Sequence, residues 1–276
     1  MAKLNEVATT INQKALTPTQ RLQSILGRVD IKEKFASMLK DKAPAFMSSI
    51  ISLYNATPQL QACDPMSIIS AAAMAATLDL AVNAQLGFAH IVPYGTNATF
   101  QIGWKGFVQL AIRTGQYKTM NAAEIYEGEL ISYNRITGET IIDDTKRKSN
   151  KIIGYVAYFR LTTGFEKHLY MTTEQVLAHA KKFSKSFGKS SSAWTTNFDA
   201  MALKTVLRLL LSKFGILSVE MQKALEFDQS VIRETSDGPK PEYVDVEMAG
   251  DAQEPVEEQP VAPTPDGKTG DLPLGK

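Results

Sequence analysis

The first eighty residues are predicted to be helical. Two helix starts are marked by a capping residue followed by proline, at Thr17-Pro18 and at Asp64-Pro65. Asp30 with Glu33 matches the capping-box pattern at the start of a further helix. The Ala-rich run over 66–80 is almost uncharged, which indicates a helix that is buried on most of its surface.

The pattern changes in the middle of the chain. Short aromatic and β-branched runs on either side of Gly95–Asn97 predict a β-hairpin. Helical spacing returns over 105–115, and Thr172 with Gln175 predicts the start of another helix. A last long helix is predicted over roughly 197–214, and further strands at 117–129, 151–161 and 167–171. We therefore expect an α+β fold, in which one small antiparallel sheet has helices before, within and after it.

The C-terminal segment differs from the rest in composition. Residues 231–276 contain seven of the twelve prolines and a single aromatic residue, Tyr243. Such a segment cannot bury enough apolar area to offset the entropy of ordering it, so a disordered acidic tail is predicted. The chain then divides into a helical N-terminal segment (1–34), a core (35–230) and this tail (231–276).

The formal net charge of +1 conceals an asymmetry along the chain. Residues 1–230 carry a net charge of +8, whereas residues 231–276 carry −7. Most of the positive excess lies between Thr145 and Lys213, where thirteen Lys or Arg residues accompany only three acidic ones. A basic block of this density points to an anionic partner, with the acidic tail as an electrostatic counterweight.

Several classes of protein are disfavoured by what the sequence lacks. One cysteine, Cys63, excludes an internal disulfide framework and a Cys-based zinc site, and the three histidines are not at ligand spacing. No stretch is apolar enough to span a bilayer and no signal peptide is recognisable, so a cytoplasmic protein is expected. The ending Gly188–Ser190 is no Walker A loop because Phe183 stands where that motif needs glycine, so ATP hydrolysis is not expected.

The strongest local signal for chemistry is the run from Lys181 to Trp194. Lysines can neutralise phosphates and flat rings can stack on any base, which favours contact with a nucleic-acid backbone and its bases. The candidate residues in this run are Lys181, Lys182, Phe183, Lys185, Phe187, Lys189 and Trp194. The alternative is a solvated loop that its aromatic residues anchor to the core.

Two helices carry further basic positions. Lys204 and Arg208 are four residues apart on the last long helix and therefore share one face. Lys105, Gln109 and Arg113 form a second stripe at the same spacing. Both stripes are candidates for phosphate contact, although basic stripes are often only solvated surface.

The acidic residues offer a rival interpretation. Glu124, Glu127 and Glu129 lie on a predicted strand, with Asp143-Asp144 nearby in sequence, and paired carboxylates could hold Mg²⁺ in a nuclease. However, the alternation of Glu127 and Glu129 with small residues is typical of a solvent-facing strand edge. No Lys or His completes a nuclease signature. His90 lies in an apolar strand, which favours a core position.

The chain resembles the RecT-type single-strand annealing proteins of phages and prophages. The resemblance covers roughly Phe35–Phe227 and rests on the runs CDPMSIISAAAMAATLDL, LGFAHIVPYG, FQIGWKGFVQLAIRTGQYK, AEIYEGE, SAWTTNFDAMALKTVLRLL and SVEMQKAL, in this order. It implies binding of single-stranded DNA, pairing of complementary strands without ATP, and assembly into rings or helical filaments, in which segment 1–34 would take part. It also implies a 5′→3′ exonuclease as a partner, and a contact of the tail with the host single-strand binding protein.

The resemblance also implies roles for individual residues. Trp104-Lys105-Gly106, Arg113, Trp194, Lys204 and Arg208 match family positions and are assigned to a DNA groove. The complete predicted DNA-binding set is Trp104, Lys105, Gln109, Arg113, Lys118, Lys181, Lys182, Phe183, Lys185, Phe187, Lys189, Trp194, Lys204 and Arg208. We expect no catalytic residue, no metal site and no cofactor, with Mg²⁺ entering only through DNA. The predicted function is a non-hydrolytic annealing protein that binds single strands and the nascent duplex; the alternatives are a passive single-strand coating protein and a nuclease.

Overall fold

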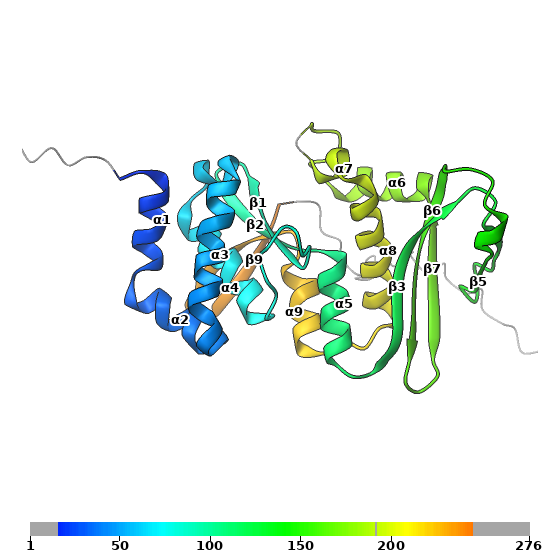
Figure 1. Cartoon of the computed structure of the whole chain (residues 1–276), viewed down its shortest axis with the longest axis horizontal. Coiled ribbons are helices and arrows are strands. Elements are labelled where there is room, and N and C mark those ends of the chain that lie inside the picture. Colours follow the sequence, from blue (N-terminus) through cyan, green and yellow to red (C-terminus); the bar gives the residue numbers. More distant parts are fainter. Residues whose placement is uncertain (1–15, 191, 245–276) are drawn as a thin grey trace, which may run out of the picture.

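The computed structural model describes residues 16–190 and 192–244. Two lobes follow one another along the longest axis, and α5 (Trp104–Arg113) and α9 (Val219–Phe227) lie between them (Figure 1). A continuous cluster of buried apolar side chains extends through both lobes. The predicted α+β class is confirmed. The segments 1–15 and 245–276 lie outside the described residues, and with them most of the predicted tail.

The first lobe begins with a helical region, as predicted, and the described residues of this region form four α-helices. They are α1 (Pro18–Leu26), α2 (Val29–Leu39), α3 (Ala43–Ala56) and α4 (Pro65–Thr77), with two 3-10 turns at Lys40–Lys42 and Pro58–Ala62. Thr17 and Asp64 cap α1 and α4 through their side chains. The predicted capping box at Asp30 is wrong, because α2 begins at Val29 and places Asp30 inside its first turn, where it pairs with Arg28 at 2.7 Å.

The sheet of the first lobe joins segments that are distant in sequence. The predicted hairpin forms β1 (Ala89–Tyr94) and β2 (Asn97–Ile102), and β8 (Ser230–Thr235) and β9 (Gly238–Tyr243) extend it in the antiparallel order β1-β2-β8-β9. The predicted tail boundary at 231 is therefore wrong for residues 231–243. Val231 and Ile232 are almost fully buried, and the prolines of β9 lie in an edge strand, where a missing N–H is tolerated.

The second lobe has a three-stranded antiparallel sheet, β3 (Tyr117–Tyr126), β6 (Ile152–Leu161) and β7 (Glu166–Thr172), in the order β3-β6-β7. The long helix α8 (Phe198–Phe214) packs on this sheet, and α6 (Thr173–Phe183) begins with the predicted capping box of Thr172 and Gln175. A separate hairpin, β4 (Leu130–Tyr133) with β5 (Thr140–Ile142), and a 3-10 turn at Asp144–Lys146 follow β3. The described residues thus form three sheets rather than the single one predicted.

At the junction of the two lobes, the backbone at the start of α5 lies very close to the backbone of the segment before β1. A Cβ atom on Gly103 would lie 2.1 Å from the carbonyl oxygen of Gly87, and one on Gly106 would lie 2.2 Å from that of Phe88. Only glycine therefore fits at these two positions without moving the backbone. The start of α5 is thereby held against the segment that leads into β1. Among the described residues, we find no helix with the length and apolar character needed to cross a membrane.

Candidate nucleic-acid interface

The lysine-rich run lies at the surface, at the end of α6 and in the loop that leads to α7 (Ala193–Thr196). Lys181, Lys182, Lys185 and Lys189 are all exposed, as the prediction required. The loop is held by its own polar groups: the hydroxyls of Ser186 and Ser192 lie 3.2 Å apart, and Thr195 donates its hydroxyl to the carbonyl oxygen of Lys189 at 2.9 Å. Lys181 and Lys182 therefore lie on the last turn of α6, and Lys185 and Lys189 lie on a folded loop.

The aromatic residues of this run face inward. The Trp194 ring is 7% exposed and lies 6.3 Å from the ring of Phe187 and 5.7 Å from that of Phe198. The predicted stacking of Trp194 on a base is wrong, because its ring anchors the loop to the core. Phe187 is half-buried against the same core. Phe183 is also half-buried, with its ring 4.6 Å from the imidazole of His179.

A pocket of about 320 Å³ separates this loop from the β1–β2 turn of the first lobe. Tyr94 and Gly95 line one side, and Ser186 and Lys189 line the other. The ammonium of Lys189 lies 5.7 Å from the centre of the Tyr94 ring. Lys189 lines the pocket, and Lys181, Lys182 and Lys185 are the exposed lysines of the adjoining helix end and loop. We call the pocket together with these four lysines the lysine groove. Tyr94 was missed from sequence because only the fold brings it beside a loop ninety residues later.

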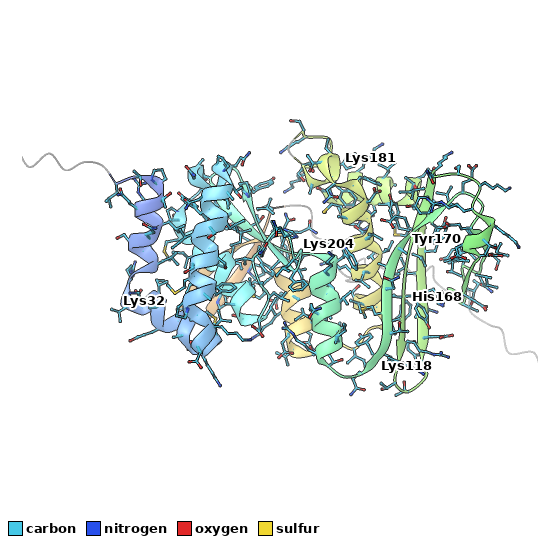
Figure 2. The ribbon with its side chains drawn as sticks, in the orientation of Figure 1. Lys32, Lys118, His168, Tyr170, Lys181 and Lys204 are labelled. Atoms are coloured by element: carbon cyan, nitrogen blue, oxygen red, sulfur yellow. The ribbon has the colours of Figure 1, made fainter. Side chains whose placement is uncertain are left out.

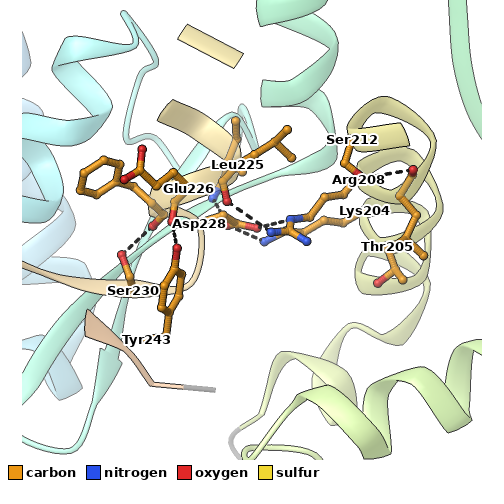
Figure 3. Close-up of polar contacts among 12 residues, drawn as sticks. Lys204, Thr205, Arg208, Ser212, Leu225, Glu226, Asp228, Ser230 and Tyr243 are labelled. Carbon is orange, nitrogen blue, oxygen red and sulfur yellow. Dashed lines mark hydrogen bonds and ion pairs between the residues drawn. The ribbon is translucent and has the colours of Figure 1, made fainter. Parts of the chain in front are cut away.

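Lys204 and Arg208 share one face of α8, as predicted, but that face lies inside the molecule. The Lys204 ammonium lies 2.8 Å from one carboxylate oxygen of Asp228, and the Arg208 Nε lies 3.6 Å from the other (Figure 3). The side chains of Lys204, Arg208 and Asp228 are 5%, 11% and 0% exposed, respectively. Their assignment to a DNA-facing surface is wrong, because a spacing of four residues defines a shared face but not what covers it.

Asp228 is the functional side chain that sequence reasoning missed. It follows α9 directly, and its carboxylate also accepts the backbone N–H of Ile102 at 2.9 Å. One carboxylate thus connects α8, the end of α9 and the end of β2. Two cations, Lys204 and Arg208, therefore face the Asp228 carboxylate in this buried cluster.

Burial and the neighbouring cations change the pKa values of two histidines, His179 and His90. Burial and the Arg208 guanidinium lower the pKa of His179 to about 4. Burial and the Lys204 ammonium also lower the pKa of His90, whereas Asp228 raises it. Both imidazoles are therefore neutral at pH 7.

The predicted stripe on α5 is partly used by the fold. Trp104 and Gln109 are half-buried, and the exposed Lys105 lies 5.9 Å from the Trp104 ring. The Arg113 guanidinium donates to the carbonyl oxygens of Leu78 and Asp79, at 2.7 Å each, and so holds α5 to the end of α4. A contact of this stripe with DNA stays a prediction.

Lys118 does not belong to the lysine groove. It is exposed near the start of β3, and Figure 2 shows it at the opposite edge of the molecule from Lys181, with Lys204 between them. The fourteen predicted residues therefore do not form one surface.

Three members of the rival acidic set, Glu124, Glu129 and Asp144, line one pocket. Glu129 is 6% exposed and accepts the backbone N–H of Tyr126 at 2.8 Å, so its predicted solvent-facing position is wrong. Glu127 accepts the hydroxyl of Ser149 at 2.8 Å. Within 16–190 and 192–244, no group of three or more His, Cys, Asp or Glu side chains is arranged to hold a metal ion.

Comparison with known proteins agrees with this architecture. The model of the RecT family matches residues 44–242, a range that includes β8 and β9. The chain is 48% identical over 241 residues to the Bacillus subtilis (strain 168) protein named "Uncharacterized protein YqaK". The aligned region covers 87% of this chain and 80% of that protein. The chain is 28% identical over 223 residues to "Protein RecT" of Escherichia coli (strain K12), with 75% of this chain and 79% of that protein covered. The resemblance noted from sequence is thereby confirmed: the chain belongs to the RecT family.

Proposed function

We propose that this protein binds single-stranded DNA in the lysine groove and pairs it with a complementary strand without ATP. Membership of the RecT family supports a role in single-strand annealing during recombination. The observation that carries the proposal is the set of four exposed lysines at the end of α6 and in the following loop, beside a pocket between the two lobes that Lys189 lines.

The chemistry of such a groove suits annealing. Each stacked base-pair step releases about 1.4 kcal/mol, so the pairing of complementary strands is downhill and needs no nucleotide hydrolysis. The obstacle is repulsion between the phosphates of the two strands. Lysine ammonium groups that hold one backbone reduce this repulsion, and because phosphate contacts carry no sequence information, strands of any sequence are accepted.

The first experiment measures single-strand affinity against salt. Changing Lys181→Ala and Lys189→Ala removes two groove charges from exposed positions, and we expect the slope of log affinity against log salt to fall by about 0.7 per lost contact. The control is Lys32→Ala with Lys223→Ala, because both lysines are exposed on helices, α2 and α9, outside the groove. An equal change of slope in both double variants would contradict a role for the groove.

The second experiment separates annealing from passive coating. Two labelled complementary oligonucleotides are mixed with the protein, and their pairing is followed by fluorescence. We expect faster pairing with or without ATP. A protein that protects the strands from nuclease without accelerating pairing would be a coating protein, and cleavage of the strands would favour the nuclease.

We further propose that the protein works as a homo-oligomer, a ring or a helical filament, in the cytoplasm. One domain of about 230 residues spans roughly 40 Å, so its groove holds only a short stretch of nucleotides. Subunits that bind head to tail would join these stretches into one track. The rate of pairing should then rise more steeply than linearly with protein concentration. A phage 5′→3′ exonuclease and the host single-strand binding protein are the proposed partners.

A further inference from the structure

We propose that the acidic segment 245–276 occupies the lysine groove when DNA is absent, and that single-stranded DNA must displace it. This inference rests on the proposed function, because it names a second ligand for the same groove. The occupant is part of the chain itself, so the protein would regulate its own access to DNA.

The position at which the segment leaves the fold supports this proposal. Val244 is the last described residue, and it lines the same pocket as Lys189 and Tyr94. The Tyr94 hydroxyl donates to the carbonyl oxygen of Val244 at 3.4 Å, and Tyr243 donates its hydroxyl to the carbonyl oxygen of Glu226 at 2.6 Å. The chain is thus fixed at the groove where the acidic segment begins.

The charges of the two parts are complementary. Segment 245–276 carries eight acidic side chains and two lysines, a net charge of −6. The lysine groove carries the exposed Lys181, Lys182, Lys185 and Lys189, and of these Lys189 lines the pocket together with Val244. Carboxylates on a peptide and phosphates on DNA compete for the same ammonium groups, and both interactions are screened by salt.

The length of the segment is sufficient. Thirty-two residues follow Val244, and a chain of this length can reach up to about 110 Å when fully extended. Because one end is attached at the groove, binding is intramolecular and independent of the bulk protein concentration. If the segment fills the groove for 70–90% of the time, the apparent Kd for DNA rises by roughly three- to tenfold.

The test uses the full-length chain with a neutral tail, in which every Asp and Glu of 245–276 is changed to Asn or Gln. We expect this variant to bind a single-stranded oligonucleotide roughly three to ten times more tightly than the wild type at low salt, with the difference disappearing at high salt. The matched control is a full-length chain in which the order of residues 245–276 is scrambled. It should bind as the wild type does, because its charge is unchanged.

A second measurement needs no DNA. A labelled peptide of sequence 245–276 is titrated with the neutral-tail protein, and its binding is followed by fluorescence anisotropy. We expect binding that Lys181→Ala with Lys189→Ala weakens and Lys32→Ala with Lys223→Ala does not. Absence of peptide binding, or binding that the groove substitutions leave unchanged, would overturn the proposal. If no variant binds DNA, the annealing function fails, while the peptide titration still decides whether the segment occupies the groove.

Discussion

At the scale of single residues, Asp228 is the side chain on which the junction between the lobes depends. It is fully buried and is the carboxylate that faces both Lys204 and Arg208. Asp228→Asn would remove the buried carboxylate that both cations face, and we expect a loss of about 3–5 kcal/mol in the free energy of unfolding. Urea unfolding followed by circular dichroism measures this loss.

The control for Asp228 is an ion pair at the surface. Glu234 pairs with Lys34 at 2.6 Å, but both side chains are about 40% exposed. Glu234→Gln should therefore cost less than about 1 kcal/mol. If the two variants were equally stable, the buried cluster would not be what joins α8, α9 and β2.

His179 predicts a dependence of stability on pH. Its pKa falls from 6.5 to about 4 on folding, so the unfolded chain binds a proton more readily than the folded one. The contribution of His179 to the free energy of unfolding is then complete above pH 6.5 and decreases as the pH falls toward 4. His179→Phe should reduce the difference in unfolding free energy between pH 7 and pH 5 by about 1 kcal/mol, once solvent screening is allowed for.

This pH effect is measured by urea unfolding of wild type and His179→Phe at the two pH values. Burial also lowers the pKa values of His90 and His168, so part of the pH dependence should survive in the variant. An identical pH dependence in wild type and variant would show that folding does not lower the pKa of His179.

At the scale of elements, the lysine-rich loop owes its shape to Trp194. Trp194→Ala removes a buried ring that packs between Phe187 and Phe198, and we expect a loss of about 3–5 kcal/mol in stability together with weaker DNA binding. Trp194→Phe keeps an aromatic ring in the core and should preserve affinity for single-stranded DNA. Thermal unfolding measures the stability of the two variants, and anisotropy titrations measure their affinity for single-stranded DNA. A Trp194→Phe variant that is stable but has lost affinity would restore base stacking as the role of this ring.

The sequence predicted most elements correctly where local signals suffice. The capping residue Thr17, the capping box at Thr172, the β1–β2 turn and the long helix α8 all follow from neighbouring residues. The β8–β9 hairpin was missed because its prolines are typical of disordered segments, and only pairing with β2 makes it an edge of a sheet.

The candidate site was predictable only in part, for the same reason. The exposed lysines of the loop follow from composition, whereas the environment of Lys204 and Arg208 depends on Asp228, twenty or more residues later in the chain. A periodic pattern shows which side chains share a helix face. It does not show whether that face meets water, DNA or a buried carboxylate.

At the scale of the whole molecule, the corrected end of the folded region changes what a truncation should do. A chain that ends at Gln229 lacks β8 and β9, and so loses the buried Ser230, Val231 and Ile232. We expect it to aggregate or to unfold without cooperativity. A chain that ends at Val244 keeps every described strand and should unfold cooperatively. The chains 1–229 and 1–244 are compared by size-exclusion chromatography and by urea unfolding. A stable, monomeric 1–229 fragment would contradict the assignment of the β8–β9 hairpin to the fold.

The pairing of β2 with β8 also constrains how the protein is made. Phe100 pairs with Ser230, so the sheet of the first lobe is complete only after a strand that lies 130 residues later in the chain has been synthesised. At 5–20 residues per second, synthesis from Phe100 to Tyr243 takes roughly 7–30 s. During this time one edge of β2 lacks its partner strand and can pair with other nascent chains. Slow translation or an early stop codon should therefore yield aggregates rather than partly active protein. Only chains that have been synthesised through the β8–β9 hairpin can complete the sheet and fold.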